Sequence, residues 1–144
     1  MSFLSIKKVL STTVVVLATF FSATALSEVA VVVHPSNDNA LTKADVTRIF
    51  LGKKRAYPNG SEAIPVDQTD GSAVRTEFVH TMLKKNDQQL KAYWAQLLFT
   101  GKSTPPKDVG GSAEVKALIA KNPALIGYID ANQLDDSVRV VLRF

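Results

Sequence analysis

Residues 64–83, with the sequence IPVDQTDGSAVRTEFVHTML, constrain the fold of this chain more than any other stretch. Their first residues are apolar and predict a short strand, small residues then predict a turn, and an amphipathic helix follows. Val74, Phe78 and Met82 recur at every fourth position, so one face of this helix is expected to be buried.

The turn of this unit is a candidate anion site. The first N–H groups of a helix have no acceptor within the helix, and the helix dipole places positive charge beside them. Ser72 adds a hydroxyl donor and Arg75 adds a cation one turn later. A purely structural interpretation stands beside this one, in which Ser72 or Asp70 caps the helix and Arg75 faces solvent.

The remaining elements predict an α/β fold. Further strands are expected at residues 28–33, 126–129 and 138–144, and further helices at residues 42–51, 86–99 and 112–121. Crossover helices between strands favour a mixed sheet flanked by helices on both faces. The residues expected to cap the helices are Thr42 with Asp45, Asn86 with Gln89, and Ser112.

Two of the helices carry apolar stripes that we expect to be buried. The stripe of the helix at 86–99 consists of Leu90, Tyr93, Trp94, Leu97 and Leu98. The helix at 112–121 is expected to bury Val115, Leu118 and Ile119. Residues 101–111 contain the pairs Pro105-Pro106 and Gly110-Gly111, and are expected to form an irregular connection.

Residues 1–27 have the features of a secretory signal peptide. Two lysines precede an apolar run at residues 9–21, and small residues follow that run. We therefore expect a soluble periplasmic protein with one domain at residues 28–144. An uncleaved anchor is the alternative, although the apolar run is short for a span of about 20 residues.

Composition excludes several classes of function. Loss of Lys7 and Lys8 with the signal peptide leaves 15 basic against 13 acidic residues, too mild an excess to favour a nucleic-acid partner. The chain has no cysteine, and the two histidines, His34 and His80, lie far apart without flanking acids. We expect no metal site, no cofactor and no enzymatic activity.

Three segments together resemble a known family. These are Leu41-Thr42 with the helix ending Ile49-Phe50-Leu51-Gly52-Lys53, the turn Asp70-Gly71-Ser72, and Ala124-Leu125-Ile126-Gly127-Tyr128-Ile129. In this order they resemble segments of the periplasmic phosphate-binding proteins. The resemblance implies a type II periplasmic-binding-protein-like fold. It also implies that the protein binds phosphate or a similar small oxyanion. The protein would deliver this anion to an ABC-type importer, its membrane partner, or sense the anion for that importer.

The resemblance is to a single lobe, because such binders have two lobes and residues 28–144 suffice for about one. The family's turn reads Arg-x-Asp-Gly-Ser-Gly-Thr, whereas this chain has Gln68, Ala73 and Val74 at the Arg, second Gly and Thr positions. The ligand residues that we expect are Gln68, Thr69, Asp70, Gly71, Ser72, Ala73 and Arg75, joined by Ser36 and Asn37 from the loop after the first strand.

Two questions stay open at this point. A single-lobe interaction or sensor module that has lost its ligand is the alternative function, and an exposed apolar patch would favour it. Pairing of two copies into a homodimer is one arrangement that would rebuild a two-lobed cleft.

Overall fold

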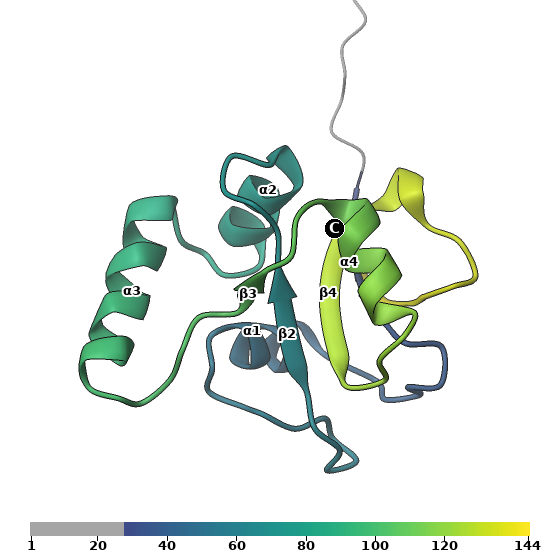
Figure 1. Ribbon diagram of the computed structural model, residues 1–144, viewed down its shortest axis with the longest axis horizontal. Helices are drawn as coiled ribbons and strands as arrows, with labels where there is room; N and C mark the ends of the chain where they lie inside the picture. The colour runs from purple at the N-terminus through teal and green to yellow at the C-terminus, as the bar shows by residue number, and fades with distance from the viewer. Residues whose placement is uncertain (1–27) are drawn as a thin grey trace, which may run out of the picture.

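The structure is a computed structural model that describes residues 28–144, and the signal peptide expected at residues 1–27 lies outside this range. The described part has the α/β fold that the sequence predicts (Figure 1). The elements are β1 (Val29–Val33), α1 (Lys43–Phe50), β2 (Ile64–Asp67), α2 (Ala73–Thr81), α3 (Asp87–Phe99), β3 (Lys107–Asp108), α4 (Ser112–Ile119), β4 (Leu125–Asp130), a short 3-10 helix η1 (Ala131–Gln133), and β5 (Arg139–Arg143).

The strands form one mixed sheet in the order β3-β2-β4-β1-β5. β2 runs parallel to β3 and β4, whereas β1 runs antiparallel to β4 and β5. All five residues of β1 are buried, as expected for an unbroken Val-rich strand with helices or loops over both faces. The expectation of a single mixed sheet is confirmed.

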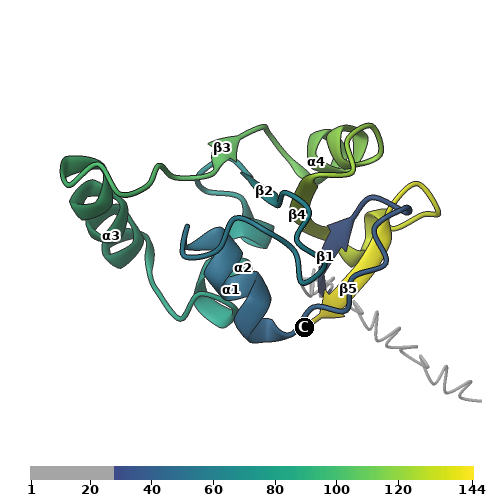
Figure 2. The same ribbon diagram turned by 90° about the horizontal axis from the view of Figure 1, so that it is seen from below.

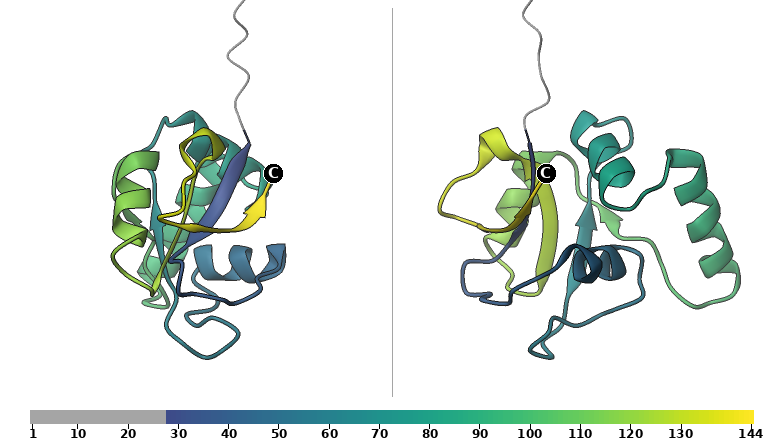
Figure 3. Two further views of the ribbon diagram at one scale, coloured as in Figure 1. Left: turned by 90° about the vertical axis from the view of Figure 1, so that its right-hand side faces the viewer. Right: turned by 180° about the vertical axis from the view of Figure 1, so that it is seen from behind.

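Two apolar clusters lie on opposite faces of this sheet, and Figure 2 shows α4 on one side of the strands and α1 on the other. The larger cluster joins alternate residues of β1 to α1, α2 and α3, and the smaller one joins the intervening residues of β1 to α4. Seen from the side and from behind, α4 lies on one face of the sheet and α1 on the other, while α3 stands at the outer end of the molecule (Figure 3). β1 and β4 therefore contribute residues to both clusters.

Local side-chain chemistry explains where two of the helices begin. The Thr42 hydroxyl accepts a hydrogen bond from the Asp45 N–H at 3.2 Å, and Asp45 accepts from the Thr42 N–H in return. Asn86 and Gln89 form the same reciprocal pair at α3. Both caps are confirmed. The expected Ser112 cap is wrong, because Gly111 occupies the N-cap position and Ser112 is the first residue of α4, with its side chain buried.

Two other expectations, the burial of Leu98 and that of Leu118, are wrong. Leu98 and Leu118 are 51% and 39% exposed, because the sheet and its loops do not reach the flanks of α3 and α4 on which these residues lie. The connection at residues 101–111 is irregular as expected, except for β3, whose two residues are too few to produce a recognisable pattern. Among the described residues, no helix is long and apolar enough to cross a membrane.

Candidate functional site

The turn between β2 and α2 has the conformation that an α-helix start requires. Gly71 has a φ of +87°, a value at which a side chain causes strain. Ser72 is the N-cap of α2, and its hydroxyl accepts a hydrogen bond from the Arg75 N–H at 3.3 Å. Ala73 and Val74 are the first two helical residues, so their N–H groups have no acceptor within the helix.

A second helix begins beside this turn. α2 follows β2 and α4 follows β3, and because these strands are parallel both helices start at the carboxyl edge of the sheet (Figure 1). The Thr69 N–H donates to the Gly110 carbonyl at 3.0 Å, which holds the two connections together. The carboxyl edge of parallel strands is where α/β folds commonly bind ligands.

Gln68 joins the two helix starts from inside the protein. It is 2% exposed, and its amide nitrogen donates to the Ser112 hydroxyl at 3.2 Å and to the Tyr128 carbonyl at 2.8 Å. Its side-chain oxygen accepts from the Ser72 hydroxyl at 2.9 Å. Both amide hydrogens of Gln68 are therefore committed to the protein, and Gln68 shapes the turn without offering a donor to a ligand.

Arg75 is surrounded by carboxylates. Its guanidinium lies 2.8 Å from Asp70, 3.2 Å from Asp87 and 3.5 Å from Asp67, and its side chain is 11% exposed. Burial alone would lower the pKa of Arg75, but the negative charges of Asp67 and Asp70 outweigh burial and the pKa is raised. One cation among three acids leaves local negative charge in excess. Through its ion pairs with Asp67 and Asp87, Arg75 also connects α2 to β2 and to α3.

Asp67 has a second partner in the sheet. The Tyr128 hydroxyl donates a hydrogen bond to the Asp67 carboxylate, and the Tyr128 ring stacks on Phe78 with centroids 3.9 Å apart. Burial, followed by the nearby charge of Asp67, raises the pKa of Tyr128 above its usual value. Thr69 donates to Asp108 at 3.0 Å, so a fourth acid also lies near the turn.

Ser36 and Asn37 do not join this site. They follow β1, which is antiparallel to β4 with Val33 opposite Ile126, so they lie at the other edge of the sheet. There they line a separate cavity of about 360 Å³ together with Asn59 and Asn122. The expectation that these two residues complete the site at Ser72 is wrong, because it ignored the direction of β1.

Sequence reasoning located the turn but missed the residues that organise it. These residues are Ser112, Tyr128 and the acids Asp67, Asp87 and Asp108, and apart from Asp67 none has a local pattern that marks it as part of the site. Asp67, as the last residue of a predicted strand, carried the clearest available signal. Within residues 28–144, no group of three or more His, Cys, Asp or Glu side chains could hold a metal ion.

No family model matches the chain, and no curated protein matches it. Several solved structures do match the chain. A protein from Clostridium perfringens, described as a phosphate ABC transporter substrate-binding protein with bound phosphate, matches with a TM-score of 0.63 at 24% identity, over 81% of this chain and 45% of that one. An ABC-type phosphate transport receptor from Vibrio cholerae matches with a TM-score of 0.63 at 18% identity, over 81% and 46%.

PstS from Borrelia burgdorferi has a TM-score of 0.57 at 13% identity, over 80% of this chain and 47% of that one. The chain thus spans less than half the length of each of these structures. At such identities the likeness concerns the fold. The described residues have the fold of a single lobe of the phosphate ABC transporter substrate-binding proteins.

Proposed function

We propose that residues 28–144 form an exported solute-binding domain for phosphate or a similar small oxyanion, which supplies an ABC-type importer or senses for it. The observation that carries this proposal is the meeting of two helix starts at the carboxyl edge of the sheet. It occurs in a fold shared with phosphate transport proteins, one of them solved with phosphate bound. Residues 1–27 serve as the signal peptide in this proposal, which an intact-mass measurement of the secreted protein tests.

The oxyanion is assigned to the start of α2. Its donors are the backbone N–H groups of Ala73 and Val74. The hydroxyls of Ser72 and Thr69 lie beside the turn, and each can donate to the anion only by giving up its hydrogen bond to Gln68 or Asp108. Gly71 permits the positive φ that this turn requires. Asp70 holds Arg75 near the site, where the cation offsets part of the local negative charge.

Binding at this site is expected to be weak. A helix start stabilises a surface anion by about 0.3–1 kcal/mol, and a hydrogen bond to a charged group contributes about 1.5–3 kcal/mol. The acids around Arg75 oppose an anion. Together these effects correspond to roughly −4 kcal/mol, or a dissociation constant near the millimolar range. A second lobe, supplied by another protein or a second copy, would exclude water and tighten binding.

The decisive variant is Ala73→Pro. Proline is well tolerated at the first position of a helix, and Ser72 already has the extended conformation, with ψ of 131°, that precedes proline. The substitution therefore removes one N–H donor and preserves α2. Calorimetric titration with phosphate at constant ionic strength should show several-fold weaker binding, while Lys43→Pro at the same position of α1 should leave affinity unchanged.

Asp87→Asn tests the role of charge in the opposite direction. It removes one of the three acids that hold Arg75, so phosphate affinity should rise several-fold, whereas Asp136→Asn in a distant loop should have no effect. Absence of phosphate and sulfate binding at millimolar concentration, or unchanged binding by Ala73→Pro, would exclude this site. The single-lobe interaction module would then become the leading function.

A further inference from the structure

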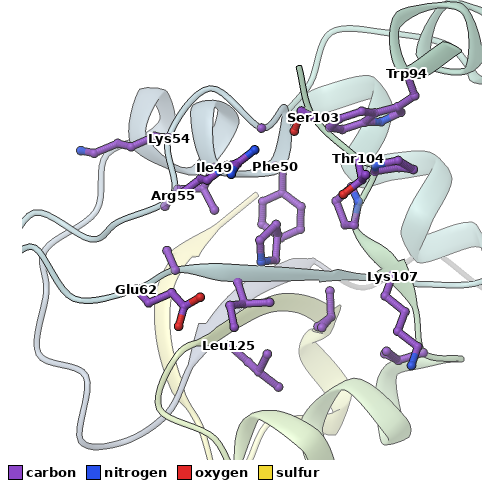
Figure 4. A pocket seen from close by; sticks show the side chains of 18 of the residues that line it. Ile49, Phe50, Lys54, Arg55, Glu62, Trp94, Ser103, Thr104, Lys107 and Leu125 are labelled. Atoms are coloured by element: carbon purple, nitrogen blue, oxygen red, sulfur yellow. The ribbon is translucent and has the colours of Figure 1, made fainter. Parts of the chain in front are cut away.

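A cavity of about 480 Å³ lies away from the turn at Ser72 (Figure 4). It is bounded by the first half of β2, the end of α1 and the connection from α3 to β3, and it shares no lining residue with the proposed oxyanion site. Its volume falls within the range of about 300–1,000 Å³ that is typical of small-molecule sites.

The cavity is open because the edge of the sheet is incomplete. β3 has only two residues, which pair with Val66 and Asp67, so the first half of β2 has no neighbouring strand on this side. Pro65 has no N–H group with which another strand could pair. A strand from another chain is therefore a poor occupant of this edge, and the cavity remains accessible.

The floor of the cavity is apolar. Phe50, Val66, Trp94 and Leu125 line it, and Trp94 is 8% exposed. Ile64 and Leu118 also line it, although they are 37% and 39% exposed. Apolar surface left open to water within a concave site is typical of a surface that binds an apolar group.

The rim carries an excess of positive charge. Lys54, Arg55 and Lys107 line the cavity with a single acid, Glu62, and Figure 4 shows Lys107 at the end opposite Lys54 and Arg55. Lys54 lies 3.6 Å from Asp45. Within the described residues, Arg55 has only a 3.5 Å hydrogen bond to the Lys102 carbonyl, and Lys107 has no ion pair.

We propose that this cavity binds an amphipathic organic anion, a carboxylate with an apolar body of medium-chain acyl size. The apolar body lies on the floor beside Trp94, the carboxylate is held by Arg55 at one end of the cavity, and Lys107 at the opposite end adds to the positive charge of the rim. Burial of Ile64 and Leu118 by the acyl chain removes apolar surface from water, and the net positive rim selects the sign of the head group.

The test uses octanoate as the probe. The protein is purified with residues 1–27 neither replaced nor fused to another sequence. Trp94 is the only tryptophan of the chain and lines the cavity, so its fluorescence reports occupancy directly. Octanoate should produce a saturable change. Octylammonium, which has the same chain and the opposite charge, should bind about tenfold more weakly, since it loses a charge-assisted hydrogen bond and meets like charges.

Two pairs of variants identify the residues responsible. Arg55→Gln with Lys107→Gln should weaken octanoate binding about tenfold, whereas Lys43→Gln with Lys121→Gln, which removes the same charge elsewhere, should not. Leu118→Gln should also weaken binding, whereas Leu98→Gln, an exposed leucine outside this cavity, should not.

Equal binding of octanoate and octylammonium, or unchanged binding by the Arg55 and Lys107 double variant with native circular dichroism, would overturn the proposal. Saturating phosphate should leave octanoate affinity unchanged. Displacement of octanoate by phosphate would contradict the proposal that octanoate has a site of its own. Loss of phosphate binding alone leaves the expected octanoate result intact, because the two sites share no residue.

Discussion

The Tyr128 hydroxyl connects the sheet to the charged cluster at the start of α2. It donates to Asp67, which also faces Arg75. Burial, and then the charge of Asp67, raise the pKa of Tyr128, and burial raises the pKa of Tyr57 as well. The folded state therefore holds these phenolic protons more tightly than the unfolded chain does.

This difference predicts a loss of stability at high pH. A group whose pKa is raised on folding contributes its full stabilisation below its unfolded pKa, about 10 for tyrosine, and loses it progressively above that value. Between pH 8 and pH 10.5 each such tyrosine should cost about 0.8 kcal/mol of the free energy of unfolding.

Urea unfolding at both pH values, on the wild type and on Tyr128→Phe, measures this loss. The variant starts less stable because Asp67 loses a donor, but its stability should fall less between the two pH values. An equal fall in the two proteins would mean that Tyr128 ionises no later in the folded state than in the unfolded chain.

Contact between α4 and β4 depends on a glycine. A Cβ atom added to Gly127 would lie 2.6 Å from Val115 Cγ1, 3.0 Å from Ile119 Cδ1 and 3.1 Å from Val66 Cγ2. Gly127→Ala should therefore destabilise the protein by about 1–3 kcal/mol through overpacking. Chemical denaturation measures the change.

A double-mutant cycle isolates the cause. Val115→Ala alone removes buried methyl groups and costs stability, but in the Gly127→Ala background it also relieves the closest contact. The combined loss should be smaller than the sum of the two single losses. Strict additivity would mean that α4 moves away from β4 as a unit, without a specific clash at Val115.

Sequence patterns predicted those elements whose causes are local. The caps at Thr42 and Asn86 depend on residues within one turn, and both are confirmed. The turn at Ser72 was also found, for the same reason. β3 could not be predicted, because its residues pair with residues of β2 that lie 41 positions earlier.

Tertiary contacts account for the remaining differences at the site. Arg75 meets Asp67 and Asp87 only because the fold brings the start of α2 close to the end of β2 and the start of α3, and no spacing in the sequence shows this. Leu98 and Leu118 match an apolar period, but a period gives the face of a helix and not how far its partner extends. Both are exposed for that reason.

At the scale of the whole molecule, stability should be unevenly distributed. β1 takes part in both apolar clusters, and all its residues are buried. α3 stands at the outer end of the molecule (Figure 3) and buries only Leu90 and Trp94 fully, while Phe99 at its end is 94% exposed. Regions with few buried contacts open at lower free energy than the core.

Hydrogen exchange followed by mass spectrometry should therefore show faster exchange for peptides from α3 than for peptides from β1 and β4. Breaking the Arg75–Asp87 pair should widen the difference, because that pair anchors the first turn of α3. In Asp87→Asn, exchange in α3 should accelerate several-fold, whereas exchange in β4 should match the wild type. Equal protection of α3 and β4 would instead show that the protein opens only as a whole, with α3 as firmly held as the sheet.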